Sequence, residues 1–128
     1  MGIKEDVLQQ AERAAKAAEV LRVTTDEKRN EALLAMVKKI RNSVDEIKEA
    51  NRQDMEAGEK AGLSAAMLDR LELTDSRIEG MAVGLEQVAG FEDPLGRVLE
   101  ERTRPNGLHL QKVSVPLGVI GVVYESRP

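Results

Sequence analysis

The stretch VSVPLGVIGVVYESRP (Val113–Pro128) decides how the rest of this chain is interpreted. Val119 to Tyr124 is almost entirely apolar, and such a run is typical of a parallel strand covered on both faces of a sheet. No residues follow that could supply the flanking strands, and a lone parallel strand leaves its backbone donors and acceptors unpaired. We therefore expect either that this strand pairs with another chain or that the sequence is the front part of a longer one.

The residues before this stretch carry helical periodicity instead. Apolar residues recur at spacings of three and four, which places them on one face of a helix. The pattern predicts five helices, over residues 3–22, about 26–41, about 44–61, 64–71 and 75–89. Ser43 with Glu46 predicts a capping box at the third helix, and Gly62 a left-handed stop after it.

The same periodicity predicts which side chains face inward. On the second helix these are Leu33, Met36, Val37 and Ile40. On the fifth helix they are Ile78, Met81, Ala82, Leu85 and Val88. The core must be built from aliphatic side chains, because the sequence has one Phe, one Tyr and no Trp.

Alternation replaces the helical period from Phe91 onward. Residues 96–102 and 108–113 read as strands, and Asn106-Gly107 between them is a strong turn signal. A β-hairpin over residues 94–115 is therefore predicted. His109 has the outward parity of its strand, so we expect it to face solvent rather than to bind a metal.

Composition excludes several classes of function. The net charge is −4 and no basic stripe is interleaved with aromatics, so nucleic acid is not an expected partner. The sequence has no cysteine, hence no disulfide, thiolate metal site or cysteine nucleophile. It shows no signal peptide and no run long enough to span a membrane, so we expect a cytoplasmic protein without membrane contact.

Two segments together resemble a known family. EANRQDMEAGEKAGLSAAMLDRLELT (Glu49–Thr74) and VPLGVIGVVYESRP (Val115–Pro128) are similar to the N-terminal part of γ-glutamyl phosphate reductases, also called glutamate-5-semialdehyde dehydrogenases. These enzymes belong to the aldehyde dehydrogenase superfamily. The resemblance runs over essentially the whole chain and covers about the first third of such a protein.

The resemblance implies an α/β aldehyde-dehydrogenase-like fold for the parent protein. Residues 1–93 would be the N-terminal helical part of the nucleotide-binding domain, and residues 94–115 part of an oligomerisation element. Residues 116–128 would be the first strand and turn of the nucleotide-binding sheet, with the strands that flank it absent. The hairpin would then take part in a homo-oligomer.

The resemblance also implies an activity. It is the NADPH-dependent reduction of L-glutamyl 5-phosphate to L-glutamate 5-semialdehyde and phosphate, in proline biosynthesis. A cysteine thiolate performs the attack in such enzymes, and the region that carries it is missing here. We therefore expect these 128 residues alone to be inactive.

The predicted cofactor-binding residues follow from the same resemblance. They are Val123, Tyr124, Glu125, Ser126 and Arg127. They come at the carboxyl end of the predicted strand, where open α/β sheets bind ligands. Arg127 could meet a phosphate or carboxylate through its planar guanidinium. A plain turn with an ion pair between Glu125 and Arg127 is the alternative, and we favour it for the chain by itself.

Asn51 and Asp54 also stand out, because both lie at the rim of the apolar stripe on the third helix. They could lie near a substrate, or they could cap a neighbouring helix and accept backbone donors. We favour the structural interpretation. Gly118 and Gly121 do not form a dinucleotide fingerprint, since the third glycine and the following helix are missing.

Two other functions remain open from the sequence. The chain could be a stand-alone helical interaction module whose terminal strand adds to a partner's sheet. It could also be part of another acyl-phosphate or aldehyde dehydrogenase built on the same scaffold.

Overall fold

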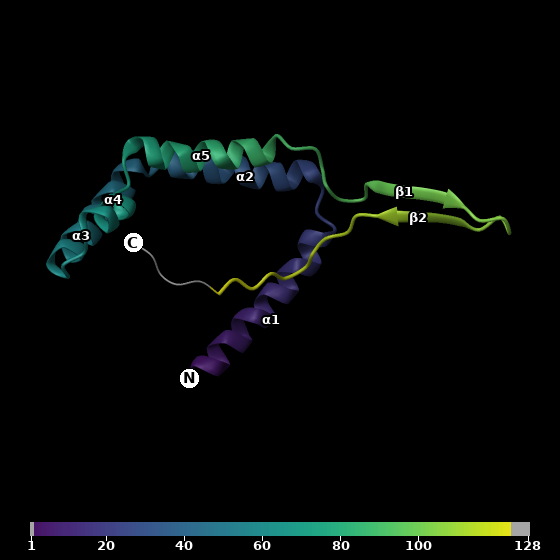
Figure 1. Cartoon of the computed structure of the whole chain (residues 1–128), viewed down its shortest axis with the longest axis horizontal. Helices are drawn as coiled ribbons and strands as arrows, with labels where there is room; N and C mark the ends of the chain where they lie inside the picture. The colour runs from purple at the N-terminus through teal and green to yellow at the C-terminus, as the bar shows by residue number, and fades with distance from the viewer. Residues whose placement is uncertain (1, 124–128) are drawn as a thin grey trace. The chain divides into compact units, whose positions relative to one another are not determined.

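The computed structural model describes residues 2–123 and divides the chain into two units. One unit contains residues up to 26 together with 92–122, and the other is built on residues 27–91. The first holds α1 (Ile3–Arg22), β1 (Val98–Thr103) and β2 (His109–Val113). The second holds α2 (Asp26–Asn42), α3 (Val44–Lys60), α4 (Ala65–Leu71) and α5 (Asp75–Ala89) (Figure 1).

The five predicted helices are confirmed, with bounds close to those that their local signals indicated. Thr74 opens α5 by accepting a hydrogen bond on its Oγ1 from the backbone N–H of Arg77, at 3.2 Å. Ser64 opens α4 in the same way, with the N–H of Met67 as donor. Gly62 follows α3 with a φ of +76°, in the left-handed region that glycine adopts without strain.

The capping box predicted at Ser43 is wrong. Ser43 has φ −110° and ψ 17°, and its side chain makes no capping hydrogen bond. Its N–H donates to the carbonyl of Ile40, and its own carbonyl accepts from the N–H of Ile47. The backbone thus turns from α2 into α3 without the extended residue that a side-chain cap needs.

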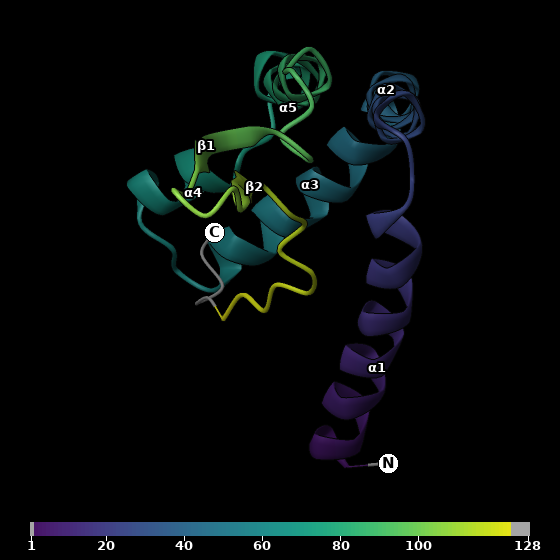
Figure 2. The same ribbon diagram turned by 90° about the vertical axis from the view of Figure 1, so that its right-hand side faces the viewer.

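Helices α2 and α5 run side by side in opposite directions (Figure 1), and Figure 2 shows them nearly end-on. The buried apolar side chains of the described residues come from this pair: Val37 on α2, and Ile78 and Ala82 on α5. These three predictions of inward-facing residues are confirmed. Leu33, Ile40 and Leu85 are half-buried.

Three residues predicted to face inward are instead exposed. Met36 is 52% exposed, Met81 44% and Val88 48%. They share the helical period of the core, but each keeps about half of its side chain in solvent. Periodicity identifies an apolar stripe, whereas burial also requires a partner to cover it.

Helix α3 packs closely on α4 and on the loop before it. Gly58 is buried, and a Cβ placed on it would lie 2.9 Å from Leu63 Cδ1 and 3.2 Å from Leu68 Cδ2. It would also lie 3.3 Å from Leu71 Cδ2. A side chain at this position would therefore push three leucines apart.

The predicted hairpin is confirmed. β1 and β2 pair antiparallel, with Glu101 opposite Gln111 and Thr103 opposite His109. Asn106 Oδ1 accepts from the N–H of Leu108 at 3.1 Å, and Gly107 has a φ of +84°. Both strands are exposed except for the half-buried Leu110. His109 is exposed as predicted, and its Nε2 lies 2.5 Å from Glu101 Oε1.

The terminal apolar run does not form a strand within the described residues. Residues 115–123 carry no ladder pairing, and Val119, Ile120, Val122 and Val123 are all exposed. A strand requires a partner for its backbone groups, and none of residues 2–123 supplies one. Tyr124 lies outside the described residues, so the assignment of 116–128 to a larger sheet stays a prediction.

Replacing Gly58 by Ala tests the close approach of α3 and α4. Alanine favours a helix over glycine by about 1 kcal/mol, but overpacking costs about 1–3 kcal/mol. We expect a net loss of about 1 kcal/mol in the free energy of unfolding, measured by urea denaturation followed by circular dichroism.

Gly80→Ala is the matched control, because nothing lies within 4 Å of a Cβ at Gly80. It should raise the free energy of unfolding by up to about 1 kcal/mol. Equal stabilisation by the two substitutions would contradict the packing described for Gly58.

Candidate functional site

The structure describes one of the five predicted cofactor-binding residues. Val123 has its whole side chain in solvent, and no described element covers it. Tyr124, Glu125, Ser126 and Arg127 lie outside the described residues. The prediction that these five residues bind a cofactor therefore stays a prediction.

Asn51 lies where α3 meets the end of α4, and it is 7% exposed. Its Nδ2 donates to the carbonyl of Leu71 at 2.8 Å. Its Oδ1 accepts from the N–H of Leu73 at 2.7 Å. The side-chain amide of Asn51 thus pairs with the carbonyl of Leu71, which has no partner within α4, and with the N–H of Leu73, which follows the helix. The structural interpretation of Asn51 is confirmed.

Asp54 does not share this role. Its side chain is exposed, and it makes no hydrogen bond or ion pair with the part of the chain that the structure describes. The prediction that it caps a helix or accepts backbone donors is therefore wrong. Asp54 is three residues beyond Asn51, but the carbonyl of Leu71 and the N–H of Leu73 pair with Asn51.

A hollow of about 290 Å³ lies beside Asn51. Its lining residues are Lys48, Asn51, Arg52, Met55, Glu72 and Leu73. The two cations in it already have acidic partners within the chain. Lys48 Nζ lies 2.9 Å from Asp75 Oδ1, and Arg52 Nη2 lies 2.8 Å from Glu49 Oε1.

These pairs change the titration of the groups that form them. Hydrogen bonds from Arg52 lower the pKa of Glu49 to about 2. The hydrogen bond to Asp75 raises the pKa of Lys48. At neutral pH, Lys48 and Arg52 are therefore charged, and each lies beside a carboxylate that offsets its charge. This favours a structural role for the hollow over binding of a free anion.

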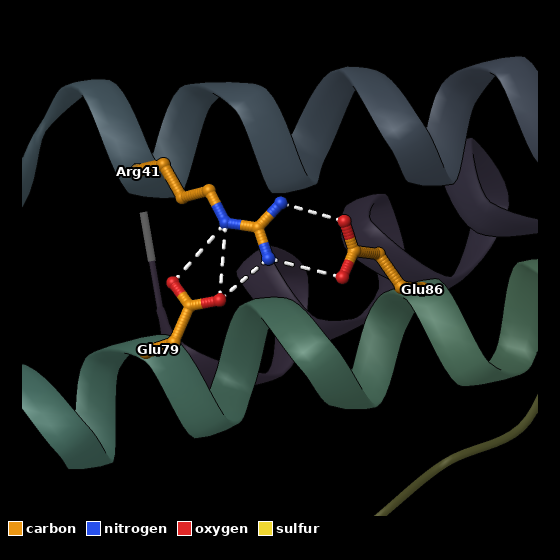
Figure 3. A network of polar contacts seen from close by, with 3 residues as sticks. All are labelled: Arg41, Glu79 and Glu86. Carbon is orange, nitrogen blue, oxygen red and sulfur yellow. Dashed lines mark hydrogen bonds and ion pairs between the residues drawn. The ribbon is translucent and has the colours of Figure 1, made fainter.

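A second polar cluster joins α2 to α5 (Figure 3). Arg41 on α2 holds two carboxylates of α5: its Nη2 lies 2.5 Å from Glu79 Oε1, and its Nη1 lies 2.6 Å from Glu86 Oε1. Hydrogen bonding from Arg41 lowers the pKa of Glu79 and that of Glu86, and raises the pKa of Arg41. The cluster thus links α2 to two positions on α5 that lie seven residues apart.

Helical periodicity alone does not identify this cluster, although the sequence carries a signal for it. Glu79 and Glu86 are seven residues apart, so they lie on one face of α5, and an arginine on a neighbouring helix can reach both. Which arginine does so depends on the pairing of α2 with α5. That pairing cannot be read from either helix alone.

The described residues hold no complete catalytic constellation. No group of three or more His, Asp or Glu side chains within residues 2–123 could bind a metal ion. His109 with Glu101 and Thr103 is an acid–base pair with a hydroxyl, on an exposed hairpin face. The hollow on the hairpin is lined by Glu100, Arg102, Leu110, Gln111 and Lys112, and His109 is not among them.

The chain is similar over its whole length to γ-glutamyl phosphate reductases. It is 50% identical to the one from Halothermothrix orenii over 128 residues, which are 100% of this chain and 31% of that protein. It is 47% identical to the one from Moorella thermoacetica, with the same coverage. The chain thus spans about a third of the length of these relatives. No protein-family model matches it.

Solved structures agree with the sequence comparison. The crystal structure of γ-glutamyl phosphate reductase from Thermotoga maritima matches with a TM-score of 0.80 and 37% identity, over 85% of this chain and 26% of that one. The enzyme from Saccharomyces cerevisiae matches with a TM-score of 0.79 and 33% identity, over 84% and 28%. The predicted resemblance and fold class are confirmed.

Replacing Asn51 by Ala tests its structural role. The substitution leaves the carbonyl of Leu71 and the N–H of Leu73 without their partner, at a cost of about 1–3 kcal/mol in the free energy of unfolding. Asp54→Ala on the same helix should change it by less than about 0.5 kcal/mol. Urea unfolding of both variants checks this, and equal losses would contradict the assignment.

The Arg41 cluster predicts how stability depends on pH. Because the pKa values of Glu79 and Glu86 lie below their ordinary value of 4.5, the stabilisation is complete above that pH. It is lost as the pH falls through the lowered values. Arg41→Gln should therefore flatten the acid limb of a plot of unfolding free energy against pH.

Lys38→Gln, which removes another cation from α2, should leave that limb unchanged. The measurement is urea unfolding from neutral pH down into the acid range below pH 4.5, because the pKa values of both carboxylates are lowered from that value. An acid limb that is unchanged in Arg41→Gln would show that the cluster does not couple the helices.

Proposed function

We propose that the chain is the N-terminal portion of a γ-glutamyl phosphate reductase. The observation that carries this proposal is 50% identity over all 128 residues to a protein of which they form 31%. The reaction is the NADPH-dependent reduction of L-glutamyl 5-phosphate to L-glutamate 5-semialdehyde and phosphate, in the synthesis of proline. The cytoplasm is the proposed location. Among residues 2–123, no helix is both long and apolar enough to cross a membrane.

The reaction divides between this chain and the rest of such an enzyme. A cysteine thiolate attacks the acyl carbon, and the bond from that carbon to the phosphate oxygen breaks. Covalent attachment splits one difficult step into two easier ones. The sequence has no cysteine, so that group belongs to the part of the reductase that this chain does not span. NADPH supplies the hydride that reduces the resulting thioester.

The contribution of this chain is support and cofactor contact. In the proposal, residues 119–124 form a strand once neighbouring strands are present. Val123 to Arg127 then lie at its carboxyl end, where the loops of an α/β sheet bind ligands. The exposed apolar run of Val119, Ile120, Val122 and Val123 supports this, because a contiguous exposed apolar segment is typical of a surface that another element covers.

The hairpin supports a proposal of self-association in the complete enzyme. β1 and β2 form a two-stranded sheet, so each strand has one edge without a ladder partner among the described residues. An isolated two-stranded hairpin is marginally stable in water, and strand edges are sites for pairing with another chain. We propose that the hairpin extends a sheet of a second subunit.

A stand-alone interaction module is the second candidate, and it is favoured by one observation. Val115, Leu117 and Val119 are exposed within an extended apolar run, which suits strand addition to a partner's sheet. The comparisons favour the reductase, since relatives of known name match the entire chain. A third candidate is another acyl-phosphate or aldehyde dehydrogenase built on the same scaffold. Assays of the enzyme with other substrates test it.

Activity measurements on two proteins test the proposal. The first is the 128-residue chain alone, and the second is the chain fused to the remainder of the Halothermothrix orenii reductase. We expect no NADPH oxidation above blank with the chain alone, and turnover with glutamyl phosphate by the fusion. Turnover by the chain alone, or a folded fusion without activity, would contradict the proposal.

A further inference from the structure

The turn between β1 and β2 contains a chemically reactive pair of residues. Asn106 is the only asparagine in the sequence that glycine follows. The side-chain carbonyl carbon of an asparagine can be attacked by the backbone nitrogen of the next residue, and a β-carbon on that residue hinders the approach. Glycine has no β-carbon. Asn106 is therefore the asparagine of this chain that is most open to the reaction.

Three hydrogen bonds hold the turn closed. The N–H of Gly107 donates to the carbonyl of Arg104 at 2.9 Å, and the N–H of Arg104 donates to the carbonyl of Leu108 at 2.8 Å. Asn106 Oδ1 accepts from the N–H of Leu108 at 3.1 Å. The nitrogen that attacks and the side chain that is attacked are thus both engaged in the closed turn.

These hydrogen bonds oppose the reaction. The nitrogen of Gly107 must give up its proton to attack, and the carbonyl of Arg104 holds that proton in place. The side chain of Asn106 must also turn its Cγ toward this nitrogen, whereas its bond to Leu108 fixes its orientation. Opening of the turn frees both groups. A two-stranded hairpin is marginally stable in water, so it opens locally without unfolding of the rest.

We propose that Asn106 is a site of spontaneous modification and that closure of the hairpin turn controls its rate. The nitrogen of Gly107 forms a bond to Cγ of Asn106, and the bond from Cγ to Nδ2 breaks. Nδ2 leaves as ammonia with the proton that Gly107 gives up. Water then opens the cyclic imide at either of its carbonyls, which yields an aspartate or an isoaspartate. Neither step oxidises or reduces any atom.

The isoaspartate cannot restore the turn. Its main chain runs through the former side chain of Asn106 and is one carbon longer. The hydrogen bond from Gly107 to Arg104 and the pairing of Thr103 with His109 both depend on the original length. Modification therefore misaligns the two strands. The inference does not depend on the proposed function, because every group that it uses lies within the hairpin.

A disulfide across the hairpin tests whether closure controls the rate. Thr103 lies directly opposite His109, and Thr103 Oγ1 is 3.2 Å from His109 Nδ1. Thr103→Cys combined with His109→Cys therefore places two cysteines side by side, and the sequence has no other cysteine to compete. Peptide mass spectrometry follows the loss of Asn106 in the whole chain at neutral pH. The reduced form is the matched control, because the two samples share one sequence.

We expect the disulfide to slow the loss of Asn106 by about fivefold or more relative to the reduced form, because it keeps the turn closed. Equal rates in the two forms would overturn the inference.

The chain without substitutions gives an independent measurement. Loss of Asn106 should be about fivefold or more faster in urea than in buffer, since urea opens the turn. In urea Asn42, which Ser43 follows, should react more slowly than Asn106, because Ser43 carries a β-carbon. Equal rates of Asn106 loss in urea and buffer, or equal rates at Asn42 and Asn106 in urea, would overturn the inference.

Discussion

Apolar side chains need a partner to cover them, and this requirement governs the whole molecule. The buried apolar residues among 2–123 are Val37, Ile78 and Ala82. Large apolar side chains such as Met81, Leu117 and Val123 stand in solvent. Burial of apolar area is the main favourable term in folding. Because few apolar side chains are buried among residues 2–123, that term is small here. This agrees with the proposal that the chain is the N-terminal portion of a longer reductase.

Polar contacts give residues 27–91 their geometry where buried area is small. Arg41 links α2 to α5, and Asn51 ties α3 to the end of α4. Exposed ion pairs contribute little stability by themselves, so the Arg41 cluster adds to the small buried core rather than replacing it. Gly58 complements them by letting α3 approach Leu63 and its neighbours closely.

Local signals predicted the elements well. Thr74 and Gly62 act through bonds and dihedral angles within a few residues, so the sequence alone indicates where helices begin and end. The same holds for Asn106-Gly107 in the hairpin. Features that depend on distant partners were predicted less well. Met36 was expected to face inward but is 52% exposed, and the strand expected at residues 119–124 does not form among residues 2–123. The Arg41 cluster was not predicted, because it requires the pairing of two helices.

The heat capacity change of unfolding of the isolated chain tests this account most directly. A globular protein of 128 residues that buries its own core shows about 1.5–1.9 kcal/mol/K, from about 12–15 cal/mol/K per residue. Because few apolar side chains are buried here, differential scanning calorimetry should give a value well below that range. A value within the range would show a self-sufficient core and contradict the account.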